Sequence, residues 1–112
     1  MTHSELISAI ILAASEKDLA LLWNNPQGAG MVARSGQKPT FMRWGLGPKE
    51  GGGLDIIGLR NSDGKFIAID AKGGRDKLSE KQIKFIRWVT MRGGIAGEAR
   101  SVEQAIELIT GG

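Results

Sequence analysis

The sequence predicts an α/β domain in which one mixed β-sheet is packed between helices. The observations that support this class are the spacing of apolar residues, the helix caps and the placement of β-type segments. Apolar residues recur at helical spacing in three segments, and each segment begins with residues typical of a helix cap. Several short β-type segments separate the first two helices, and one more lies between the second and the third. We therefore expect the order α-β-(β)-β-β-α-β-α in a single domain over residues 1–112.

The chain is expected to begin with a helix and a strand. The segment "THSELISAIILAA" (2–14) carries leucine and isoleucine at helical spacing, and Thr2 with Glu5 fits the S/T-x-x-E capping box. The segment "LALLWNN" (19–25) predicts a strand that ends before a proline.

Residues 27–53 are rich in glycine and contain strand-like pieces near 31–35 and 40–44. These glycines do not match a dinucleotide or phosphate-binding loop, because none lies between a strand and a helix at the required spacing. We expect them to permit tight backbone turns.

A hairpin and a helix follow. The segments "LDIIGLR" (54–60) and "KFIAIDAK" (65–72) predict two strands joined by the turn "NSDG". The segment "LSEKQIKFIRWVTMR" (78–92) predicts a helix that Ser79 and Gln82 cap.

The chain is expected to end with a short strand, "IAGEA" (95–99), and a helix, "SVEQAIELI" (101–109). Ser101 and Gln104 repeat the cap pattern of the preceding helix.

Composition restricts the chemistry that the protein can perform. The chain has no cysteine and one histidine, His3, which excludes disulfides, thiolate sites and a histidine cluster for zinc. A bound metal would therefore need oxygen ligands, which favours Mg²⁺ or Mn²⁺. Because the sequence contains neither a bilayer-spanning apolar run nor a signal-peptide pattern, we expect a soluble, cytoplasmic protein.

The net charge of +3 is unevenly distributed. Residues 60–92 carry nine bases against four acids, whereas residues 1–30 carry one base against three acids. A local concentration of positive charge suits a phosphate backbone, although solvated helix faces can also be basic.

The hairpin predicts a cluster of three charged residues. If "NSDG" is a four-residue loop, Arg60 faces Lys65, and counting back along both strands places Asp55 opposite Asp70. Lys72 then projects from the same face, because residues two apart on a strand point the same way. Two facing carboxylates within about 5 Å ordinarily require a cation or a shared proton.

Two alternatives remain at this point. The aspartates could lie at frayed strand ends in water, or a slipped register could change the facing pair. Against the first alternative, the strands are apolar on both faces, and a sheet covered on both sides is a costly place for solvated charge.

These residues resemble the PD-(D/E)xK nuclease superfamily, in which an Asp on one strand precedes a (D/E)-x-K triplet on the next. Here the pattern is Asp55, fourteen intervening residues, and Asp70-Ala71-Lys72. The segments "MRWGLGPKEGGGLDIIGL", "DGKFIAIDAKGGRDKLSEKQIKFI" and "GGIAGEARSVEQAIELI" together resemble the small stand-alone VRR-NUC domains of phages and bacteria.

The resemblance implies a restriction-endonuclease-like core and a metal-dependent nuclease site. Asp55, Asp70 and the backbone carbonyl of Ala71 correspond to metal ligands for Mg²⁺ or Mn²⁺. Lys72 corresponds to the lysine that positions or activates the attacking water. The second motif acid is Asp here, where the family more often has Glu.

Other site residues have two interpretations. Gln82 and Glu5 match helix residues that reach toward the metal in related nucleases, and each also fits a helix cap. Arg43 matches an entry segment that could contact a phosphate, or it is simply solvated. The bases that could extend a DNA-binding face are Lys77, Lys81 and Lys84.

The resemblance implies an endonuclease that acts on branched DNA, such as a Holliday junction, as a homodimer. A flap-cutting, nicking or restriction-like nuclease is an alternative within the enzyme class. A catalytically silent DNA-binding module of the same fold is an alternative outside it.

Overall fold

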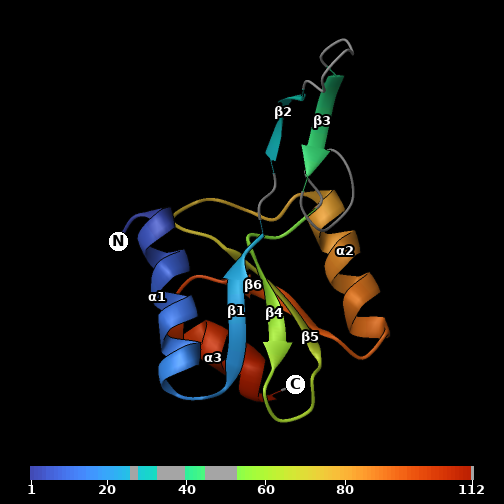
Figure 1. Ribbon diagram of the computed structural model, residues 1–112. Coiled ribbons are helices and arrows are strands. Elements are labelled where there is room, and N and C mark those ends of the chain that lie inside the picture. The colour runs from blue at the N-terminus through green and yellow to red at the C-terminus, as the bar shows by residue number, and fades with distance from the viewer. Residues whose placement is uncertain (26–27, 33–39, 45–52, 112) are drawn as a thin grey trace.

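A computed structural model describes residues 1–25, 28–32, 40–44 and 53–111 (Figure 1). The elements follow in the order α1 (His3–Glu16), β1 (Ala20–Asn24), β2 (Gly28–Val32), β3 (Thr40–Trp44), β4 (Ile56–Arg60), β5 (Phe66–Ala71), α2 (Glu80–Met91), β6 (Ile95–Ala99) and α3 (Val102–Gly111). The predicted α/β class is confirmed, and the three helices and the main strands lie where the sequence pattern places them.

The main sheet is mixed, with four strands in the order β1-β4-β5-β6. β4 pairs antiparallel with both β1 and β5, whereas β6 pairs parallel with β5. A parallel pair requires a crossover connection, and α2 supplies it between β5 and β6.

β2 and β3 form a separate two-stranded antiparallel sheet, which the sequence pattern did not predict. The expected strand at 40–44 is confirmed as β3. The expected strand near 31–35 begins three residues earlier, at Gly28, and residues 33–35 lie outside the described ranges. Figure 1 shows this hairpin extending from the end of the core at which β1 ends.

Helices cover both faces of the main sheet, as Figure 1 shows. α1 and α3 pack on one face, where Ile10, Ile67, Ile69 and Ile109 are fully buried. α2 packs on the other face. There its buried Phe85 and Val89 contact Leu54, which precedes β4, together with Ile57 of β4 and Ala68 of β5. Each fully buried Ile or Leu stabilises the fold by roughly 1.5–3 kcal/mol, so both faces of β4 and β5 contribute to stability.

The β4–β5 register agrees with the prediction. Ile56 faces Ile69, Gly58 faces Ile67, and Arg60 N donates to Lys65 O at 2.9 Å. Gly58 also faces Leu22 of β1, and a Cβ atom there would lie 2.1 Å from the Leu21 carbonyl oxygen. The close approach of β1 therefore requires glycine, and the ladders continue through it without a bulge.

The helix caps agree with the sequence in two of three cases. Complete capping boxes join Thr2 to Glu5 in α1 and Ser79 to Gln82 in α2. At α3 the Ser101 hydroxyl accepts from Gln104 N, but the Gln104 side chain accepts from Arg100 N instead of the Ser101 amide. Within the described ranges, no helix has the length and apolarity that crossing a membrane requires.

Candidate metal and phosphodiester site

The predicted cluster of Asp55, Asp70 and Lys72 lies at one end of strands β4 and β5. Asp55 immediately precedes β4, and Asp70 is the penultimate residue of β5. Continuing the observed register by one pair places them opposite each other. One hydrogen bond joins the pair, in which Asp55 N donates to Asp70 Oδ1 at 3.3 Å. A second bond joins Asp55 to the end of β5, where Ala71 N donates to Asp55 Oδ2 at 3.0 Å.

Asp70 is the buried member of the pair, with a side chain that is 2% exposed. Lys72 Nζ lies 2.9 Å from Asp70 Oδ2, which is an ion pair without regular hydrogen-bond geometry. Oδ2 therefore carries charge in a buried position without accepting a hydrogen bond from the described residues.

The surroundings of Asp70 make its carboxyl group hold a proton more tightly than an exposed aspartate does. Burial raises the pKa of the Asp70 carboxyl to about 6. The nearby Lys72 ammonium acts in the opposite direction, and the negative charge of Asp55 raises the pKa further. A bound cation would offset both the burial and the repulsion between the carboxylates.

Gln82 makes both of the contacts that its two interpretations require. Its Oε1 accepts from Ser79 N at 3.0 Å, which completes the cap of α2. Its Nε2 donates to Asp70 Oδ1 at 3.3 Å and to Gly53 O at 3.4 Å. One amide can thus cap the helix and hold the buried carboxylate.

His3 is the site residue that sequence reasoning missed. Its Nε2 lies 3.0 Å from Asp55 Oδ2 and 3.0 Å from Ala71 O, two oxygens that the resemblance implies as metal ligands. The contact joins residues more than fifty positions apart, so no local pattern indicates it. The only available signal is that His3 precedes buried Leu6 and Ile10 by three and seven residues, on one helix face.

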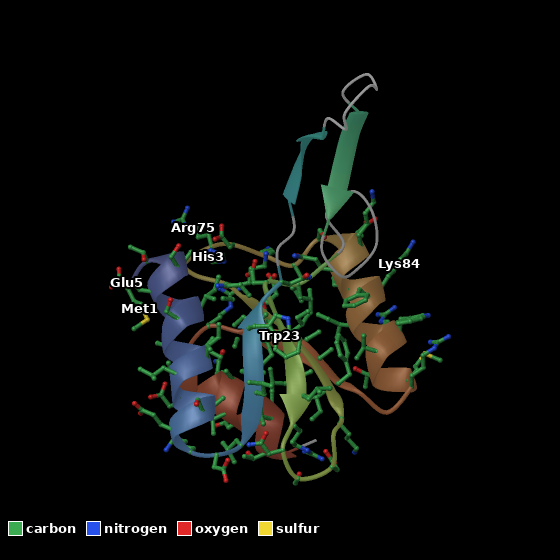
Figure 2. All side chains as sticks on the ribbon, viewed as in Figure 1. Met1, His3, Glu5, Trp23, Arg75 and Lys84 are labelled. Carbon is green, nitrogen blue, oxygen red and sulfur yellow. The ribbon has the colours of Figure 1, made fainter. Side chains whose placement is uncertain are left out.

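Glu5 is not brought to the aspartates. Its carboxylate accepts from Thr2 N at 3.2 Å, and this contact holds the pKa of Glu5 below its usual range. Residues two apart on a helix lie about 200° apart around the axis, so Glu5 and His3 point in opposite directions. Figure 2 shows Glu5 on the outer side of α1.

The predicted DNA-contacting bases are spread around this end of the core. Lys77, Lys81 and Lys84 are all exposed, in the loop before α2 and on α2 itself. In Figure 2, Lys84 projects outward from α2. Arg43 lies in β3 opposite Ala29.

The oxygen donors of this site fit a hard divalent cation. Two carboxylates and a backbone carbonyl are typical ligands of Mg²⁺ or Mn²⁺, which retain water at their other positions. Asp70 Oδ2, which has the ion pair with Lys72 but no hydrogen bond of regular geometry, is the buried oxygen that a cation would stabilise most. In the described parts of the chain, no group of three or more His, Asp or Glu side chains that could hold a metal ion is found.

Comparison of the chain with protein-family models found no match, and a search of curated proteins found none either.

Proposed function

We propose that this chain is a divalent-cation-dependent DNA endonuclease of the PD-(D/E)xK type, with a restriction-endonuclease-like core similar to VRR-NUC domains. The observation that carries this proposal is the buried Asp70 carboxylate, which faces Asp55 and lies 2.9 Å from Lys72. A mixed sheet between helices is compatible with such a core, and the ordered Asp, Asp and Lys are the residues that the chemistry needs.

Asp55, Asp70 and the Ala71 carbonyl would hold Mg²⁺ or Mn²⁺. The cation, when bound, supplies Lewis-acid polarisation of the phosphate and lowers the pKa of a bound water. Lys72 places a positive charge where the phosphate gains negative charge, and it orients the attacking water. Gln82 fixes the orientation of the Asp70 carboxylate through its 3.3 Å hydrogen bond.

DNA would bind across the end of the core that carries these residues. Bases in the α2 region supply phosphate contacts there, and the β2–β3 hairpin extends from the same end (Figure 1). Residues 26–49 contain four bases and no acid. Such a distribution suits a polyanion whose backbone must cross the site.

The proposed substrate is branched DNA, cleaved by a homodimer. A small catalytic domain gains DNA-binding surface by pairing, and two symmetric sites suit a four-way junction. An exposed apolar strip on β1 and β4 offers a surface for pairing, and its members are Leu21, Trp23 and Leu59. Trp23 is seen over the β1–β4 pair in Figure 2.

A cleavage assay tests this function. Purified protein is incubated with Mg²⁺ or Mn²⁺ and a panel of four-way, flap, nicked and linear duplex DNAs. We expect cation-dependent cleavage that is fastest on the four-way junction and falls at least about 100-fold in Asp70→Asn, because a ligand of the catalytic cation is lost. Glu103→Gln, which makes the same change of charge on α3, should cleave like the wild type.

Two results would contradict the proposal. Equal cleavage by the wild type and Asp70→Asn would exclude this site, and cleavage of none of the DNAs would exclude the endonuclease. A preference for flap or nicked DNA would keep the enzyme class and change the substrate.

A further inference from the structure

His3, the first residue of α1, approaches the proposed metal site from the side opposite α2. His3 Nε2 is 3.0 Å from both Asp55 Oδ2 and Ala71 O, and no other histidine occurs in the chain. The His3 side chain is 54% exposed, so water and a cation can reach the ring. Figure 2 shows His3 at the start of α1, on the side of the helix away from Glu5.

The local structure holds His3 in this position. Thr2 and Glu5 close a complete capping box, which fixes the backbone at the first turn of α1. Leu6 and Ile10 are buried against the sheet, and the face of α1 that they define also carries His3. The cap therefore holds the histidine toward the strand ends, which gives Glu5 a positioning role.

The two distances match the spacing of neighbouring ligands around a cation. In an octahedral site with bonds of about 2.1 Å, adjacent donor atoms lie roughly 3 Å apart. His3 Nε2 has this separation from a carboxylate oxygen and from a carbonyl oxygen. A neutral imidazole binds a cation through Nε2 when its proton is on Nδ1, and an exposed ring can exchange that proton through water.

A nitrogen donor changes which cation the site prefers. Mg²⁺ favours oxygen ligands, whereas imidazole suits transition-metal ions, and Mn²⁺ accepts both kinds of ligand. Oxygen ligands alone would leave Mg²⁺ and Mn²⁺ poorly distinguished.

We propose that His3 is a ligand of the catalytic cation through Nε2 and makes the site prefer Mn²⁺ over Mg²⁺. This inference rests on the proposed function, because it adds a ligand to the cation held by Asp55 and Asp70.

Electron paramagnetic resonance of bound Mn²⁺ tests the proposal without any DNA. In protein carrying no added histidine tag, Mn²⁺ alone should show nitrogen coupling from one imidazole, and the signal can only come from His3. In His3→Ala the coupling should vanish and the Mn²⁺ dissociation constant should rise at least about tenfold, with a smaller change for Mg²⁺.

Two further variants sharpen the result. His3→Glu replaces nitrogen by oxygen, so it should bind Mn²⁺ without nitrogen coupling and bind Mg²⁺ relatively better than the wild type. Glu5→Gln preserves an acceptor for the Thr2 amide and should keep the nitrogen coupling.

Failure of this inference can be told apart from failure of the proposed function. Wild-type protein that binds Mn²⁺ without nitrogen coupling overturns the role of His3 alone. Tighter or unchanged Mn²⁺ binding in His3→Ala does the same, because His3 would then only compete with the cation for its oxygens. Wild-type protein that binds no Mn²⁺ overturns the metal site and, with it, the role of His3.

Discussion

At the scale of single residues, Asp70 combines burial with an incomplete set of partners. It accepts from the Asp55 amide and from Gln82 through Oδ1, while Oδ2 has only the ion pair with Lys72. A buried charge with too few partners lowers the stability of the fold. Selection for stability alone would favour a neutral side chain here, which supports the proposal that the carboxylate binds a cation.

The raised pKa of Asp70 fixes the sign of its effect on stability. The folded state binds the Asp70 proton more tightly than the unfolded state does, since the pKa is about 6 instead of 3.8. The contribution of this group to stability is therefore greatest below pH 3.8 and is lost as the pH rises to about 6. The raised pKa already includes the favourable contact with Lys72.

We predict that Asp70→Asn stabilises the metal-free protein at pH 7.5, because asparagine resembles the neutral carboxyl. The expected gain in unfolding free energy is on the order of 1–2 kcal/mol, reduced from the full effect of the shift by solvent screening. Urea denaturation with a chelator at pH 7.5 and at pH 4 measures it. The gain should nearly disappear at pH 4, and a variant less stable than the wild type at pH 7.5 would contradict the prediction.

At the scale of elements, two helix starts define the site. α1 presents His3 and α2 presents Gln82, each at a helix start closed by a capping box. Both helices also direct the positive end of their dipoles toward the end of the sheet that carries the aspartates, which favours negative carboxylates and phosphate there. The capping signals that begin the two helices therefore also place side chains at the proposed metal.

We predict that Ser79→Ala and Gln82→Ala separate capping from the site. Each variant loses part of the α2 cap and should lose roughly 1 kcal/mol of stability. Only Gln82→Ala also loses the contact with Asp70, so its DNA cleavage rate should fall at least tenfold while that of Ser79→Ala stays near the wild-type rate. Thermal unfolding measures the loss of stability, and single-turnover cleavage well below the melting temperature measures the loss of activity. Equal cleavage rates in the two variants would show that Gln82 acts only as a helix cap.

The hairpin and the helices could be predicted because their signals are local. The turn "NSDG" sets the register that brings Asp55 opposite Asp70, and caps set the helix starts. The contact of His3 with Asp55 could not be predicted, because it depends on how α1 packs against β5. Likewise the strand-like segment at 40–44 indicates a strand but not its partner, which is β2 and not a strand of the main sheet.

The three helices together leave part of the main sheet uncovered. α2 packs against β6 and against Ala68 of β5 and Ile57 of β4. Leu21 and Trp23 of β1 and Leu59 of β4 remain exposed. Leu21 faces Leu59 across the ladder, so the strip is continuous. An exposed apolar strip of this kind is typical of a surface that pairs with another chain.

We predict that this strip forms the homodimer. Leu21→Lys should convert the dimer to a monomer, because it places a charge at the centre of the apolar contact. Leu12→Lys on α1 is the matched control, since Leu12 is 57% exposed and Leu21 is 62% exposed. Size-exclusion chromatography with light scattering measures the mass. A wild-type monomer at the concentrations that cleave DNA would contradict the homodimer, and a dimeric Leu21→Lys would place the contact elsewhere.

Calorimetric titration of Mn²⁺ into the wild type and into Asp55→Asn measures whether Asp55 and Asp70 jointly bind a divalent cation, as we claim. The side chain of Asp55 is 24% exposed, so the variant should fold and the comparison should report on binding. We predict one clear binding event in the wild type that weakens at least about tenfold in Asp55→Asn. Equal binding, or no binding by either protein, would contradict the claim and leave a DNA-binding module without catalysis as the better description.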